Sequence, residues 1–167
     1  MGRPPAKPPS RALDRGLLPS LLGYVLRRAQ LSVFSDFTTT FAKAGEALTP
    51  GEFGLLVLVE RNAGLSQMAL ARALGIDRST LVPILDRLQA RGLLLRHRSL
   101  TDGRTHALAL TPAGEKALAR FIRLVRTHEK RIASGLSATE ISTLIDLLNK
   151  VHRSARSSQR VSREQER

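Results

Sequence analysis

The chain has 167 residues, 42% of them hydrophobic and 25% charged, so it is long and apolar enough to fold around a core of its own. It contains no cysteine, which excludes disulfides, thiolate metal sites and thiol redox chemistry. Lysine and arginine outnumber aspartate and glutamate by 27 to 14, which favours nucleic acid over an acidic protein or a lipid surface as the partner.

No run of about 18 apolar residues is present to span a bilayer. The basic N-terminus leads into no apolar segment followed by a cleavage signal, so secretion is not expected. The sequence therefore predicts a soluble cytoplasmic protein with no membrane partner.

Both ends of the chain are basic and lack a periodic apolar pattern. Residues 1–11 contain four prolines and no acid, which predicts a disordered basic arm. Residues 152–167 are rich in serine and arginine, which predicts a flexible basic tail. Each end carries a net charge of +3 out of the total of +13, so more than half of the excess belongs to the residues between them.

Between these ends the apolar pattern predicts six helices and one hairpin. The helices are expected at about residues 17–44, 50–62, 67–74, 78–91, 112–133 and 138–151. Thr49 and Ser137 are each followed three residues later by glutamate, the pattern of a capping box, while Ser66, Asp77 and Thr111 are simple N-caps. The hairpin combines residues 93–98 and 105–110 around Asp102-Gly103, a strong turn signal.

The third and fourth predicted helices are joined in the pattern of a helix-turn-helix. Ala71 offers a small side chain for the crossing, Gly75 a residue free to turn, and Leu81 an apolar anchor in the second helix. This spacing alone fits any helical hairpin equally well. The basic hairpin that follows favours a winged helix, in which the second helix enters the major groove and the wing lies along the minor groove.

The wing residues predicted to contact DNA are Arg96, Arg98 and Arg104, with Asp102 orienting Arg104 rather than acting as a catalytic acid. The alternative for these charges is an ordinary solvated loop. His97 and His106 are expected to lie opposite each other in the hairpin, but two imidazoles without a third ligand do not make a zinc site. No catalytic constellation and no phosphate-binding loop is present, so neither a metal, a cofactor nor an enzymatic activity is predicted.

At this point the chain resembles the MarR family of winged-helix transcription factors, the multiple antibiotic resistance regulators. The resemblance covers about residues 15–155. The matching residues are Leu65-Ser66-Gln67, Ala71, Leu74-Gly75-Ile76-Asp77, Arg78-Ser79-Thr80-Leu81, Leu85-Asp86-Arg87-Leu88, Arg91-Gly92-Leu93, Arg96, Asp102, Arg104 and Leu110-Thr111-Pro112-Ala113-Gly114. Two departures are Gly103, where the family often has arginine, and the pair Val82-Pro83 inside the recognition helix.

The resemblance implies a mainly α fold with a small β-hairpin wing, built as a homodimer whose first, fifth and sixth helices interlock. Residues 12–48 and 111–151 would form the helical dimerisation region, and residues 49–110 the DNA-binding lobe. It also implies that an aromatic ligand held between the two regions modulates DNA binding. The sequence therefore predicts a repressor released from a palindromic operator in double-stranded DNA, the alternative being a ligand-independent architectural DNA-binding protein.

Within the recognition helix, a stripe of Leu81, Ile84, Leu85 and Leu88 is expected to be buried, which leaves the other side chains facing the DNA. The full set of candidate DNA-binding residues is Gln67, Arg78, Ser79, Thr80, Val82, Pro83, Arg87, Arg96, Arg98, Asp102 and Arg104.

The candidate ligand-binding residues lie on the first two helices. Phe34, Phe37 and Phe41 fall on adjoining parts of one helical face, and Phe53 opens the next helix. Ordinary packing in the core or the dimer interface is the favoured interpretation for any single one of them, and an effector pocket is the alternative. In the pocket interpretation, Thr38 supplies a hydroxyl, and Arg28, or else its neighbour Arg27, pairs with the carboxylate of an aromatic effector.

Overall fold

The computed structural model describes residues 13–62, 64–98 and 106–165. The 3-10 turn η1 (Leu18–Ser20) precedes the long helix α1 (Leu22–Lys43). The lobe follows as α2 (Pro50–Arg61), α3 (Gln67–Leu74), α4 (Arg78–Ala90), β1 (Leu94–Arg98) and β2 (His106–Leu110). The chain ends with α5 (Pro112–Ile132) and α6 (Ala138–Gln165).

The predicted caps form as expected. Thr49 and Glu52 make the complete capping box of α2, and Ser66, Asp77 and Thr111 each accept a hydrogen bond from a backbone N–H in the first turn of the helix that follows. These side chains satisfy donors that the first turn of a helix leaves unpaired, and they fix the starts of four helices.

Two helix boundaries differ from the sequence prediction. α1 begins at Leu22 rather than Leu17, because Leu21 has an extended backbone that separates the helix from the turn containing Pro19. The expected helix end near Val151 is wrong, because α6 continues to Gln165. Residues 152–165, expected as a flexible tail, therefore have a helical backbone. The segment 138–165 contains neither glycine nor proline, and its arginine, glutamine and alanine residues are good helix formers.

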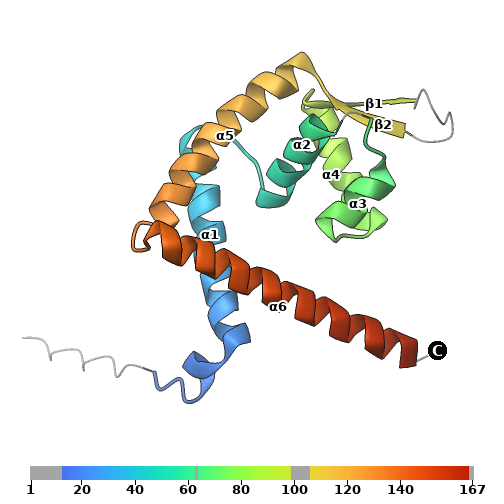
Figure 1. Cartoon of the computed structure of the whole chain (residues 1–167). Coiled ribbons are helices and arrows are strands. Elements are labelled where there is room, and N and C mark those ends of the chain that lie inside the picture. Colours follow the sequence, from blue (N-terminus) through green and yellow to red (C-terminus); the bar gives the residue numbers. More distant parts are fainter. Residues whose placement is uncertain (1–12, 63, 99–105, 166–167) are drawn as a thin grey trace, which may run out of the picture.

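The helices α2, α3 and α4 and the hairpin share one continuous core with α1 and α5. Figure 1 shows α2, α3 and α4 gathered beside the hairpin, with α5 leading away from the wing along α1. Side chains of the lobe such as Leu56, Leu70 and Leu85 are fully buried, and the same cluster continues through Phe41 and Phe121 into the contact between α1 and α5. Burial of this aliphatic surface is the main favourable contribution to folding.

The hairpin is antiparallel, and its register corrects one expectation. His97 pairs with Ala107, and His106 pairs with Arg98, so the two histidine positions are not opposite each other. The sequence placed the turn half a residue too early, and a shift of one position in register changes every partner in the ladder. The loop before α3 joins the edge of the hairpin through a bridge between Ser66 and Ala107.

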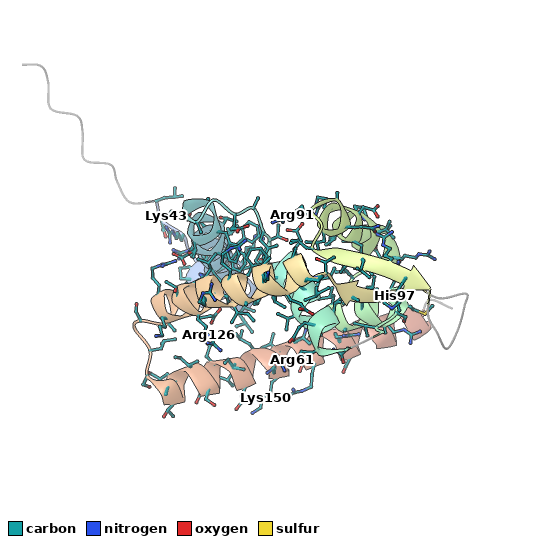
Figure 2. The ribbon with its side chains drawn as sticks, turned by 90° about the horizontal axis from the view of Figure 1, so that it is seen from above. Lys43, Arg61, Arg91, His97, Arg126 and Lys150 are labelled. Carbon is teal, nitrogen blue, oxygen red and sulfur yellow. The ribbon has the colours of Figure 1, made fainter. Side chains whose placement is uncertain are left out.

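The last helix makes few contacts with the rest of the chain. Seen from above in Figure 2, α6 runs along one side of the molecule, below α5. Its side chains Leu144, Ile145, Leu147 and Leu148 are all exposed in a single chain. Among the helices that the structure describes, none is long and apolar enough to cross a membrane.

Candidate nucleic-acid interface and effector cavity

The turn between α3 and α4 has the geometry that a helix-turn-helix requires. Gly75 adopts a left-handed backbone with φ 67° and ψ 29°, a conformation that L side chains rarely adopt. The backbone N–H of Ile76 donates to the carbonyl of Ala71 at 3.1 Å and closes the end of α3. This turn sets the direction in which α4 leaves α3.

Asp77 organises the start of α4. Its Oδ1 accepts the backbone N–H of Thr80 at 2.7 Å and the hydroxyl of Ser79 at 2.6 Å. These hydrogen bonds, that from Ser79 first, lower the pKa of Asp77 below its usual value. The hydroxyl proton of Ser79 is therefore used within the protein, while its oxygen stays exposed and able to accept from DNA.

The burial pattern of α4 matches the expected division of its faces. Leu81, Leu85 and Leu88 are fully buried, and Ile84 is partly buried. Of the α4 residues expected to face DNA, Val82 is half-buried and the others are exposed, namely Arg78, Ser79, Thr80, Pro83 and Arg87. The helix is continuous through Pro83, and Gln67 lies half-buried at the start of α3.

Two arginines expected at the DNA have partners within the lobe. Arg87 donates its Nε–H to Oε1 of Glu52 at 3.2 Å. Arg96 lies on β1 and pairs with Asp86 of α4 at 2.5 Å, while its Nε is buried without a partner among the described residues. Arg96 therefore belongs to the base of the wing, where it ties β1 to α4. The side chain of Arg98 and the residues Asp102 and Arg104 lie outside the described residues.

The aromatic residues of the expected ligand set have different surroundings in a single chain. Phe37 and Phe41 are buried and stack with ring centroids 4.5 Å apart, and Phe41 also contacts Phe121. Phe53 packs partly buried against the core, whereas Phe34 is 47% exposed. Phe37 and Phe41 thus contribute to the core, in line with the alternative interpretation.

Arg28 lies away from this core, on the exposed surface of α1. Its guanidinium lies 5.8 Å from the ring centroid of Tyr24, a cation–π distance. It precedes Thr38 by ten residues on α1, or about 15 Å along the helix axis. A ligand that contacts both residues must therefore bridge that separation less the reach of the Arg28 side chain.

A cavity of about 510 Å³ lies where α1, the α1–α2 connection, the start of α2 and α4 meet. Its walls include Thr38 and Phe41 from the expected ligand set, but not Arg28, Phe34, Phe37 or Phe53. The remaining walls include Leu48, Glu46, Glu52, Arg87 and Arg91. The cavity combines an apolar wall with the guanidinium groups of Arg87 on α4 and of Arg91, the residue that caps the end of α4.

The arginines of this cavity are both engaged. Arg91 donates to the carbonyl of Ala47 at 2.6 Å and lies 3.8 Å from Glu46, and Figure 2 shows it between α1 and the lobe. Glu46 in turn accepts from Nε of Arg120 on α5 at 2.8 Å. The α1–α2 connection is thereby linked to both α4 and α5.

A polar cluster that the sequence did not reveal joins α1 to α5. Arg131 donates to both oxygens of Asp36, at 2.8 and 2.7 Å, and also donates to the hydroxyl of Thr40. Nδ1 of the buried His128 lies 2.7 Å from Oδ2 of Asp36. Hydrogen bonding from Arg131, and then from His128, holds the pKa of Asp36 well below its usual range.

Comparison with known proteins identifies the family. Residues 48–105 match the sequence profile of the MarR family. Over 149 residues, 89% of each chain, the protein is 39% identical to a putative transcriptional regulatory protein for the hcr operon of Thauera aromatica. The chain belongs to the MarR family. It is a winged-helix DNA-binding transcriptional regulator, and MarR-family proteins function as dimers.

Solved MarR-family structures agree in fold over most of the chain. The transcriptional repressor CouR bound to a 23-mer DNA duplex is 42% identical, covers 85% of this chain and 99% of its own, and superposes with a TM-score of 0.80. CouR bound to p-coumaroyl-CoA gives 42% identity, coverage of 84% and 98%, and a TM-score of 0.77. PcaV from Streptomyces coelicolor, in complex with its natural ligand, is 27% identical, covers 87% of this chain and 99% of its own, and has a TM-score of 0.76.

Proposed function

We propose that this MarR-family protein is a homodimeric repressor, not an enzyme, that binds a near-palindromic operator and releases it when an aromatic ligand binds. The observation that carries this proposal is the 42% identity to CouR over 99% of that repressor's chain, in a structure that contains a DNA duplex. The exposed start of α4, with Arg78, Ser79 and Thr80, supplies the groups that read base edges in the major groove.

The dimer is supported by apolar side chains that a single chain leaves uncovered. Leu144, Ile145, Leu147 and Leu148 of α6 and Leu31 of α1 are all exposed. Large apolar side chains left exposed on helices in this way are characteristic of a subunit interface. Two lobes related by a twofold axis would then read two halves of a symmetric operator.

We propose an aromatic acid or its coenzyme A thioester as the effector. CouR has been solved with p-coumaroyl-CoA, which supports a thioester. A ligand that contacts both Arg28 and Thr38 of the cavity must span about 15 Å along α1, which favours an extended thioester over a small acid. The effector must bind the DNA-incompetent lobe spacing more tightly than the DNA-bound one, since equal binding shifts no equilibrium.

Selection from a random pool of duplexes tests the DNA-binding proposal. The wild-type protein should enrich one near-palindromic sequence, and its affinity for that operator should exceed its affinity for random DNA at physiological salt by at least about a thousandfold. Equal affinity for both would favour the architectural alternative. Titration of the protein–operator complex with hydroxycinnamic and benzoic acids and their thioesters then tests the effector class.

A further inference from the structure

Glu52 is a buried carboxylate at the start of α2, and it has two separate sets of partners. Its side chain is only 6% exposed. One oxygen, Oε2, accepts the backbone N–H of Thr49 at 2.8 Å and the hydroxyl of Thr49 at 3.1 Å. The other, Oε1, accepts from Nε of Arg87 at 3.2 Å. The first set caps α2, and the second reaches across to the recognition helix.

Only the contact with Arg87 depends on the negative charge of Glu52. A glutamine at the third helical position completes a capping box as glutamate does, because its carbonyl oxygen accepts the same backbone N–H. A buried carboxylate, by contrast, is costly without a cationic or hydrogen-bonding partner, and Arg87 is the cation that the structure pairs with it. The guanidinium of Arg87 is therefore held at the protein side of α4.

The position of this contact on α4 matters for DNA reading. Arg87 lies nine residues after Arg78, about 13 Å further along the helix. Arg91, one turn beyond Arg87, is bound to Ala47 and Glu46 of the α1–α2 connection. The second half of α4 is thus fixed at two successive turns, and a tilt at that half is transmitted along the rigid helix to the residues at its start.

We propose that Glu52 is a positioning residue for operator recognition, which holds the recognition helix in its reading orientation through Arg87. This inference rests on the proposed DNA-binding function. It predicts that removing the charge of Glu52 impairs discrimination between operator and random DNA more than it impairs binding itself. The freed Arg87 would contact phosphates on any sequence, while the start of α4 would lose its fixed direction.

The test compares Glu52→Gln with Glu60→Gln, an exposed glutamate on the same helix that pairs only with its neighbour Arg61 among the described residues. Both substitutions are isosteric and remove one negative charge, so they change the net charge of the protein equally. Affinities for the selected operator and for random duplex are measured by fluorescence anisotropy over a salt series. Glu52→Gln should lower the affinity ratio by about fivefold or more, a size typical of coupled positions, whereas Glu60→Gln should leave it within about twofold.

A double substitution shows whether Glu52 acts through Arg87. In an Arg87→Gln background, Glu52→Gln should lower the ratio no further, because the contact is already lost. The same affinity ratio for Glu52→Gln as for Glu60→Gln, or an undiminished effect of Glu52→Gln in the Arg87→Gln background, would overturn the proposal. A change in thermal stability with an unchanged ratio would also do so, since it would leave Glu52 a purely structural role.

Arg87→Gln alone covers the case in which Glu52→Gln does not fold. Arg87 is 58% exposed, so its substitution leaves no cavity in the core. Loss of a simple phosphate contact would weaken operator and random binding alike, whereas loss of positioning lowers the ratio. An unchanged ratio in this variant would overturn the inference. Wild-type protein that fails to discriminate at all would instead contradict the proposed function.

Discussion

Gly114 lies in the first turn of α5, where the backbone approaches the base of the wing closely. A Cβ placed on Gly114 would lie 1.9 Å from the carbonyl oxygen of Leu93, although real Cβ contacts essentially never fall below 3.0 Å. Gly114→Ala therefore requires the two backbones to separate by at least about 1.1 Å. The same carbonyl accepts the N–H of Thr111 at 3.2 Å, so the separation also strains the link between the end of β2 and the start of β1.

The magnitude follows from these contacts. Overpacking costs about 1–3 kcal/mol, and a weakened buried hydrogen bond adds about 1 kcal/mol. Alanine recovers up to about 1 kcal/mol of helix propensity relative to glycine. Because the obstacle is backbone and not a flexible side chain, we expect Gly114→Ala to lower the free energy of unfolding by about 2–3 kcal/mol.

Urea denaturation followed by circular dichroism measures this effect, with all variants at one protein concentration because a dimer's stability depends on concentration. Gly51→Ala is the matched control. Gly51 also lies in the first turn of a helix, and a Cβ there meets nothing within 4 Å. The control should be neutral or slightly stabilising. Equal unfolding free energies for Gly114→Ala and wild type would refute the close approach between α5 and Leu93.

Further predictions concern acid stability, base reading, salt dependence and the effector. The structure lowers the pKa of Asp36 below the ordinary carboxyl value of 3.8. The ionised carboxylate therefore contributes stability above pH 3.8, and this contribution is lost as the pH falls through the lowered pKa. In denaturation curves measured over a series of pH values, Asp36→Asn should reduce the loss of stability at acid pH. Arg78→Ala should reduce the operator-to-random affinity ratio, each good base contact being worth about 1–3 kcal/mol, whereas Arg104→Ala should weaken both affinities alike. Operator affinity should fall steeply as the salt concentration rises. Deletion of residues 1–11 should make this dependence less steep but change the operator-to-random affinity ratio little, and loss of operator preference in the truncated protein would contradict this. Arg28→Ala should weaken a coenzyme A thioester in calorimetric titration but not the free acid, and equal affinities of the thioester for variant and wild type would exclude Arg28.

Local sequence signals predicted the elements of the lobe well because they act over three or four residues. Thr49, Ser66, Asp77 and Thr111 each form the cap expected of them, and Gly75 turns where the helix-turn-helix spacing requires. The same local reasoning located the buried stripe of α4, since a helix repeats its faces every 3.6 residues.

The candidate site was harder to predict because its decisive contacts join residues distant in the chain. Glu52 is recognisable in the sequence as the third residue of a capping box, but nothing local indicates that its second oxygen binds Arg87. Likewise, Asp36 shows no signal of its partners His128 and Arg131, which lie on another helix. The histidine pairing in the wing failed for a related reason, since the turn dipeptide specifies a hairpin but not its register.

The two halves of α1 have different surroundings, and this division bears on how a ligand would control DNA binding. Near its start, Leu22 and Val25 are exposed in a single chain, as expected of a surface that a second subunit covers. Near its end, Phe41 is buried against α5, and Thr38 and Phe41 line the cavity that Arg87 and Arg91 of α4 close. One rigid helix thus connects the proposed dimer interface to the recognition helix. A ligand that fits the cavity in only one arrangement of α1 and α4 would couple its own binding to the spacing of the two lobes. A ligand bound only to the exposed surface near Arg28 would not contact α4 and would leave that spacing unchanged.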